Sequence, residues 1–230
     1  GKVLYINGTA VATSTDLTNL SAFDLPTIGK SVTSSSFFTG AIGELVFLNN
    51  VPTQIVRQCL EGYMAWKHTG VGSALPSTHP FLTRPPLVDD MTSAVNDLWT
   101  PTRTWANGTA TNLKLWYDMS DTTYRGLQVS STAIETIRDK SGNGKHATQS
   151  INTTRRPALV TDAYGTGLHC ARFDGTSDNM LFDGTFLVNT NYSIFGVVAR
   201  GSSGGKYWLA SSNSSTTNGR ISVGWTSDIK

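Results

Sequence analysis

A strand that passes directly into one amphipathic helix, in the first third of the chain, constrains the fold most. Apolar residues alternate from residue 42 to residue 48 as in a half-buried strand, and Asn-Asn-Val-Pro at 49–52 ends it. The next apolar residues recur at helical spacing: Ile55, Val56, Cys59, Leu60, Tyr63 and Met64. Gly70 favours the end of that helix. We therefore predict a strand and a helix that resemble the end of a domain.

Short strand-like segments separated by Gly, Asn and Pro make up most of the remaining sequence. Before the helix they lie at 3–12, 23–29 and 37–48. After it they lie at 113–118, 134–138, 169–173, 180–182, 192–200, 207–211 and 220–225. Short strands at this spacing are typical of a β-sandwich. Between the two groups, the proline-containing residues 82–111 favour an extended linker.

Composition limits the function classes. With 38% hydrophobic residues in a chain of 230, a core can form. A net charge of +2 with only 15% charged residues gives no electrostatic reason to bind nucleic acid or an anionic membrane. No apolar run has the length to span a bilayer, so we expect no membrane insertion. Cys59 and Cys170 each lie in an apolar pattern, which favours two buried free thiols over a disulfide.

Catalytic patterns are scarce in the sequence. The histidines stand beside no nucleophile-elbow or papain-type signature: His68, His79, His146 and His169. A glycanase needs two carboxylates that face one cleft. Glu44 is the sole acid of its strand, and Glu61 and Glu135 have no second acid beside them in the pattern. Neither cysteine lies at zinc-ligand spacing. We therefore expect a protein that is not an enzyme, with a glycanase as the least favoured reading.

Two loops rich in Asp, Asn and Gly are candidates for a calcium site. Asp139 and Asn143 in the first loop, and Asp174 and Asp178 in the second, carry the hard oxygen ligands that calcium requires. The same residue types also form turns, because their side chains cap local amides and they tolerate left-handed backbone. Both interpretations stay open, and the turn interpretation is favoured. Calcium is the only cofactor that the pattern suggests.

Tryptophans outside the strand patterns are candidates for contact with a ligand. An exposed aromatic ring can stack on the apolar face of a sugar, and it can also pack against a neighbouring domain. Trp99 and Trp105 lie in the linker, so we expect them to contact a glycan or another domain. Trp66, Trp116 and Trp208 lie in helix or strand patterns, so we expect them to pack in the core.

Several of these segments together resemble a known family. They are Gly43-Glu44-Leu45 in the strand, Glu61-Gly62-Tyr63 and Lys67 in the helix, and Leu75-Pro76 with His79-Pro80 after it. This pattern is similar to the closing segment of laminin-G-like, concanavalin A-like jelly-roll domains of bacterial surface proteins and phage virion proteins. Residues 3–12 resemble the penultimate hairpin of such domains, with Asn7-Gly8 as its tight turn.

Later segments resemble the opening strands of the same domains. They are 113–118, 137–148, 156–157 and 171–178. The closing half thus precedes the opening half. We favour a fragment of tandem domains: residues 1–81 form the C-terminal half of a first jelly roll, 82–111 a linker and 112–230 the N-terminal half of a second. The remaining strands would come from the rest of a parent chain. The alternative is one circularly permuted jelly roll whose two halves pair.

The resemblance implies an all-β, concanavalin A-like jelly-roll β-sandwich with one short helix after the last strand of the first domain. It also implies a non-enzymatic phage virion protein with a structural or adhesion role, as a tail fibre, receptor-binding or capsid-decorating protein. Its expected partners are cell-surface glycans or other virion proteins, and its expected location is the virion or the extracellular space. The alternative is a carbohydrate-binding or adhesive module of a secreted bacterial protein. A homo-oligomer is compatible with the virion protein and with the secreted bacterial module.

Overall fold

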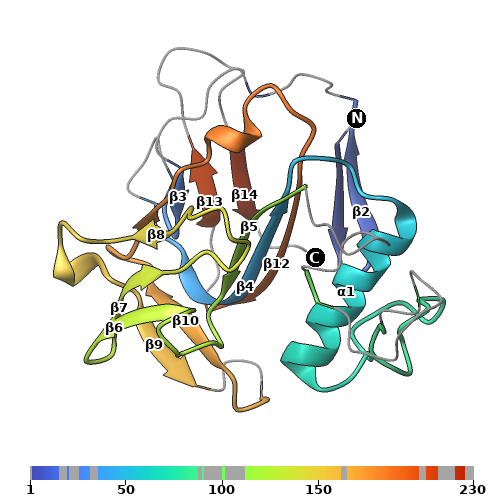
Figure 1. The fold of residues 1–230 in the computed structure, drawn as a ribbon, viewed down its shortest axis with the longest axis horizontal. Coiled ribbons are helices and arrows are strands. Elements are labelled where there is room, and N and C mark those ends of the chain that lie inside the picture. The colour runs from blue at the N-terminus through green and yellow to red at the C-terminus, as the bar shows by residue number, and fades with distance from the viewer. Residues whose placement is uncertain are drawn as a thin grey trace.

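The computed structural model describes residues 2–15, 20, 26–31, 36–87, 90, 100–101, 112–161, 165–201, 206–211 and 221–225. These residues form mostly β-strands, with one α-helix, α1 (Gln54–Thr69), beside a large curled sheet (Figure 1). The strands before α1 are β1 (Lys2–Ile6), β2 (Thr9–Ser14), β3 (Thr27–Ile28) and β4 (Thr39–Leu48). The strands after it are β5 (Leu113–Asp118), β6 (Leu127–Ser130), β7 (Ala133–Ile137), β8 (Ala147–Thr148), β9 (Ala158–Thr161), β10 (His169–Asp174), β11 (Met180–Leu181), β12 (Ser193–Arg200), β13 (Lys206–Ser211) and β14 (Ile221–Trp225). Two 3-10 turns, η3 (Thr153–Arg155) and η4 (Thr185–Leu187), interrupt this run.

Strand β4 pairs with three neighbours in a sheet that contains 12 of these strands, joined by antiparallel pairing. One edge of β4 pairs along its length with β12. The other edge pairs with β10 near the start of β4 and with β5 from Glu44 onward. The register against β12 shifts at Gly43, where one residue bulges from the ladder. Because of this bulge, Ile42 and Leu45 both enter the core inside the curled sheet.

The pairing of β4 joins residues 1–81 to residues 112–230, which the fragment interpretation assigns to separate half-domains. β4 comes from 1–81, and its partners β5, β10 and β12 all come from 112–230. In the same way β3 pairs with β11 and β13. β4 is buried from Gly40 to Leu48 by neighbours within the described residues. Whether the chain is a fragment of tandem domains or one permuted unit stays a prediction.

Two hydrophobic clusters lie on opposite faces of β4. The first lies inside the curled sheet, and Phe47, Tyr117 and Phe173 are among its largest members. The second lies between the sheet and α1, where Val46 and Leu48 of β4 pack against helix residues and Phe81. The helix members are Val56, Cys59, Leu60 and Met64. The predicted apolar stripe therefore holds α1 on the sheet, although Ile55 is exposed.

The ends of α1 and the state of the cysteines agree with the sequence. Thr53 precedes the helix, and Gly70 ends it with a left-handed φ of 71° while its N–H donates to the carbonyl of Trp66. Cys59 and Cys170 are buried and free, which confirms the prediction of two unpaired thiols. In the described part of the chain, no helix combines the length and the apolar character needed to cross a bilayer.

Strands β1 and β2 form a separate hairpin that packs near α1. Its turn is Asn7-Gly8, whose φ angles of 49° and 76° are both positive, as a type I′ turn requires. The predicted turn is thus confirmed. The ring of Tyr5 lies under the guanidinium of Arg57 on α1, 4.3 Å from ring centroid to Cζ.

Candidate functional site

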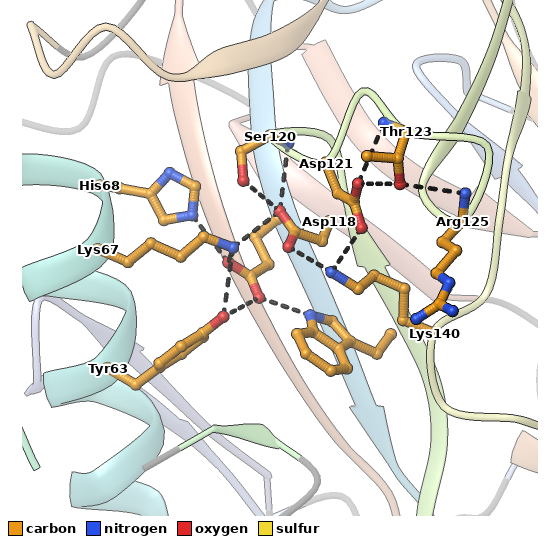
Figure 2. A network of polar contacts seen from close by, with 11 residues as sticks. Tyr63, Lys67, His68, Asp118, Ser120, Asp121, Thr123, Arg125 and Lys140 are labelled. Atoms are coloured by element: carbon orange, nitrogen blue, oxygen red, sulfur yellow. Dashed lines mark hydrogen bonds and ion pairs between the residues drawn. The ribbon is translucent and has the colours of Figure 1, made fainter. Parts of the chain in front are cut away.

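A network of charged and polar side chains fills the space between α1 and the sheet (Figure 2). The C-terminal half of α1 contributes Tyr63, Lys67 and His68, which point toward the strands. Tyr63 and Lys67 are four residues apart and so share a helix face. We call the whole set the Glu44–Asp118 network; its other members are Glu44, Trp116, Asp118, Ser120, Asp121 and Lys140.

Glu44 and Asp118 lie opposite each other on β4 and β5. Residues directly opposite on antiparallel strands point to the same face of a sheet. The bulge at Gly43 turns Glu44 toward α1 while its neighbour Leu45 enters the inner core. The fold thus places two carboxylates under the last turns of one helix.

The carboxylate of Glu44 is fully buried and contacts four donor groups. Its Oε1 accepts hydrogen bonds from the hydroxyl of Tyr63 at 3.0 Å and from Nε1 of Trp116 at 2.6 Å. Its Oε2 accepts from Nζ of Lys67 at 2.9 Å, and Nε2 of His68 lies 2.8 Å from the same oxygen. The exposed fraction of the Glu44 side chain is 0%. Both oxygens are therefore engaged, and the charge is compensated rather than left unpaired in the interior.

Asp118 is held ionised by two lysines and a hydroxyl. Its Oδ1 accepts from Nζ of Lys67 at 2.7 Å and from Oγ of Ser120 at 2.6 Å, and its Oδ2 accepts from Nζ of Lys140 at 2.9 Å. Burial alone would raise the pKa of Asp118. Lys67, Ser120 and Lys140 together outweigh burial and lower the pKa to about 2.

Lys140 connects the buried part of the network to the surface. Its Nζ bridges Asp118 and Asp121, the latter at 3.0 Å, and lies 4.7 Å from the ring centroid of Trp116. Burial alone would lower the pKa of Lys140, but the two aspartates outweigh burial and raise it. The pKa of Tyr63 is also raised, by burial first and then by the Glu44 carboxylate, so its hydroxyl keeps the proton that it donates.

The network is arranged to hold elements together. The ion pairs and hydrogen bonds of Lys67 join α1 to both β4 and β5, so they tie residues 1–81 to residues 112–230. A glycanase acid must reach the sugar, either directly or through one water. Glu44 has no exposed surface through which it could do so. The arrangement also places each of two lysine amines, those of Lys67 and Lys140, in contact with two carboxylates.

The first loop of the predicted calcium site forms a turn against β5. Oδ1 of Asp139 accepts from the backbone N–H groups of Trp116 and Ser141, and Oδ2 accepts from the N–H of Lys145. Nδ2 of Asn143 donates to the carbonyl of Leu113 at 2.9 Å. These side chains therefore fix the loop to the strand in the way that the turn interpretation describes.

The second loop contains its own set of turn contacts. Oδ1 of Asp174 accepts from the N–H groups of Thr176, Ser177 and Asp178, and Oδ2 of Asp178 accepts from the N–H of Asp174. Burial, with a smaller contribution from the Asp174 carboxylate, raises the pKa of Asp178 to about 6. Within the described residues no group of three or more His, Cys, Asp or Glu is placed to hold a metal ion. The calcium site stays a prediction.

The structure describes some of the tryptophans that the sequence singled out and not others. Trp99 and Trp105 lie outside the described residues, so their predicted contacts stay a prediction. Trp116 and Trp208 are buried, which confirms their expected packing. The structure adds Tyr124, a residue that is 75% exposed and whose ring centroid lies 5.9 Å from Cζ of Arg125.

Sequence reasoning missed the acidic partner of Glu44. Asp118 belongs to the next strand of the sheet but is far from Glu44 in sequence. Glu61 and Glu135 pair with basic residues, Glu61 with Arg57 at 2.6 Å and Glu135 with Arg156 at 3.2 Å. The signal in the sequence was a lone acid in an otherwise apolar strand. Such an acid is expected to be buried, and a buried carboxylate needs a hydrogen-bond donor or a cation beside it.

No family model, no curated protein and no solved structure matches the chain.

Proposed function

We propose that the chain is a concanavalin A-like jelly-roll module of a structural or adhesion protein, as in a phage tail fibre, receptor-binding or capsid-decorating protein. In this proposal it is a single permuted unit that binds cell-surface glycans or other virion proteins and performs no catalysis. The sequence resemblance supports the family and the virion setting. The mostly β architecture and the pairing of β4 with strands from 112–230 are compatible with such a sandwich.

The observation that carries the non-enzymatic part is the state of Glu44. A catalytic carboxylate in a glycanase has to exchange protons with, or attack, a bound sugar. Glu44 is instead surrounded by four donors that come from α1 and β5. Its opposite residue, Asp118, is saturated by Lys67, Ser120 and Lys140. Carboxylates engaged in this way attach the helix to the sheet, which is a structural role.

The loop that holds Tyr124 is the described surface that we propose for glycan contact. The exposed ring of Tyr124 offers an apolar face on which a pyranose can stack, and the guanidinium of Arg125 beside it can donate to sugar hydroxyls. Asp121 and Thr123 shape this loop, because Oδ1 of Asp121 accepts from both the N–H and the hydroxyl of Thr123. A shaped loop presents the ring with little loss of conformational entropy on binding.

A glycan array probed with the full chain, together with mass spectrometry of purified phage particles, tests this function. We expect binding to a defined set of bacterial surface glycans, or the presence of the protein in particles. Tyr124→Ala should reduce glycan binding at least about 5-fold, since stacking on an aromatic ring is worth roughly 1 kcal/mol or more. The matched control is Ile151→Ala, which also truncates an exposed apolar side chain and should leave binding unchanged.

Absence from particles together with no glycan binding would contradict the proposal. Glycan binding by a protein encoded beside a signal peptide and a catalytic domain would instead favour the secreted bacterial module. Hydrolysis of a bound glycan that disappears in Glu44→Gln would show that the protein is an enzyme.

A further inference from the structure

Nζ of Lys67 lies between two carboxylates at hydrogen-bonding distance from each. It is 2.7 Å from Oδ1 of Asp118 and 2.9 Å from Oε2 of Glu44. Lys67 belongs to α1 and Asp118 to β5, so the contact joins two elements that are distant in sequence. An amine and a carboxyl group held in contact are the two halves of an amide.

The site shields these groups from bulk water. The exposed fractions of the side chains are 0% for Glu44, 6% for Asp118 and 21% for Lys67. Condensation releases water, so a site of low hydration favours the amide over its hydrolysis. Well-oriented groups in one molecule react with effective molarities on the order of 10⁵ to 10⁸ M. Holding the amine and the carboxylate in contact therefore gives them a rate advantage over the same two groups free in solution.

We propose that Lys67 and Asp118 form an isopeptide bond, an amide between their side chains, with Glu44 as the acid–base group. The ion pair contains every atom of the product. Nζ of Lys67 bonds to Cγ of Asp118, the bond from Cγ to one oxygen breaks, and that oxygen leaves as water with two protons from Nζ. The net charge of the pair is zero before and after. No oxidant, cofactor or further reactant takes part.

Glu44 is placed to carry the protons. The amine attacks only after it has lost a proton, and Oε2 of Glu44 already accepts a hydrogen bond from Nζ. Tyr63 and Trp116 donate to the other oxygen of Glu44 and so fix the orientation of its carboxylate. Glu44 passes the proton on to the departing oxygen and returns to its starting state.

The barrier to this reaction is the stability of the ion pair itself. The neighbouring cations and Ser120 outweigh burial and hold the pKa of Asp118 at about 2, so its carboxyl is ionised before reaction. Lys140 lowers the barrier, because its ammonium contacts Oδ2 of Asp118 and stabilises the negative charge that develops there during attack. Because the ionised carboxyl of Asp118 resists attack, the reaction is slow relative to folding, and the cross-link accumulates in the folded protein.

Lys67 is the reacting lysine rather than Lys140. Both ammonium groups contact Asp118, and each has a second carboxylate nearby. The second carboxylate of Lys140 is Asp121, whose side chain is 19% exposed and whose other oxygen is engaged by Thr123. Glu44 has no exposed surface, so the carboxylate that takes the proton from Lys67 is shielded from solvent, whereas the second carboxylate beside Lys140 is not.

Mass spectrometry of the purified full chain tests the proposal directly and does not depend on the proposed function. We expect an intact mass about 18 Da below the mass calculated from the sequence, the loss of one water. Protease digestion followed by fragmentation should yield one cross-linked peptide pair that joins Lys67 to Asp118. A folded sample that keeps its full mass after prolonged incubation would overturn the proposal.

Variants separate this cross-link from other losses of water. Lys67→Arg keeps the positive charge beside Asp118 and should restore the full mass, and Glu44→Gln should slow the loss of mass at least 100-fold. The matched control, Lys140→Arg, should still lose about 18 Da. Succinimide formation at Asp174-Gly175 or Asp183-Gly184 also removes one water but leaves no cross-linked peptide. A cross-linked peptide pair that persists in Lys67→Arg, or a cross-link that maps to Lys140, would contradict the assignment.

Discussion

Glu44 on β4 lies directly opposite Asp118 on β5, and the ammonium group of Lys67 contacts both carboxylates from α1. This relationship joins the two long segments of the sequence in one place. The strands pair through their backbones, and the helix is attached through side chains. The same contacts also account for how acidic groups are accommodated on a buried face of the sheet.

Tyr63→Phe should destabilise the protein by about 1 to 3 kcal/mol, because it leaves one buried oxygen of Glu44 with a single donor, Trp116. Urea unfolding measured by tryptophan fluorescence checks the change. Tyr124→Phe is the matched control, since it removes the same hydroxyl from a ring that is 75% exposed, and it should change stability by less than about 0.5 kcal/mol. Equal effects of the two variants would contradict the description of the Glu44–Asp118 network.

Gly29→Ala should destabilise the fold by about 2 kcal/mol or more. A Cβ at Gly29 would lie 2.3 Å from Cδ1 of Phe173 on β10, and the backbone there has a φ of 86°. Gly165→Ala isolates the backbone contribution, because its φ is 77° and no heavy atom of the described residues lies within 4 Å of the added Cβ. It should cost only about 1 kcal/mol. The excess cost at Gly29, measured by thermal unfolding, reports the packing of 1–81 against 112–230, and no excess would contradict that packing.

Asp178 should make the protein less stable at pH 7 than at pH 4. Its folded pKa of about 6 lies above the unfolded value near 3.9, so its stabilising contribution is full below pH 3.9 and is lost as the pH rises through 6. We expect Asp178→Asn to remove about 1 to 2 kcal/mol of this pH dependence in urea unfolding. Asp174→Asn is the control of opposite sign, because backbone donors outweigh burial and lower the pKa of Asp174. Parallel pH profiles for the two variants would contradict these assignments.

Calcium should leave the unfolding temperature unchanged if Asp139, Asn143, Asp174 and Asp178 act as turn residues. The carboxylate oxygens of the three aspartates already accept backbone N–H groups. The measurement is differential scanning calorimetry in millimolar calcium and then in chelator. A ligand that binds only the folded state raises its stability by about 2.7 kcal/mol at 100 times its dissociation constant. A rise that Asp178→Asn abolishes would instead establish the calcium site.

The sequence was sufficient to predict most strands and the helix. Seven strand predictions after the linker correspond to β5, β7, β10, β11, β12, β13 and β14, and the helix ends at Gly70. The strands β6, β8 and β9 were missed. They are short, and β6 and β9 are largely half-buried or exposed, so pairing with neighbours rather than local pattern makes them strands.

The pairing of strands and the Glu44–Asp118 network were harder to predict. A resemblance orders segments along the chain, but it does not say which edge of β4 each later strand joins. The register of β4 against β5 decides that Glu44 meets Asp118, and that register is a tertiary property. Asp139 was singled out only as a turn former or a calcium ligand, and nothing in the pattern indicated its partner Trp116, which lies on another element.

Hydrogen exchange of the β4 amides, read by NMR in the full chain, tests most directly whether residues 1–81 and 112–230 form one sheet. The account predicts that β4, paired on both edges with strands from 112–230, exchanges on the order of 10³-fold more slowly than β1 in its two-stranded hairpin. Exchange of β4 at the rate of β1 would contradict the account, because it would mean that β5, β10 and β12 do not cover its edges.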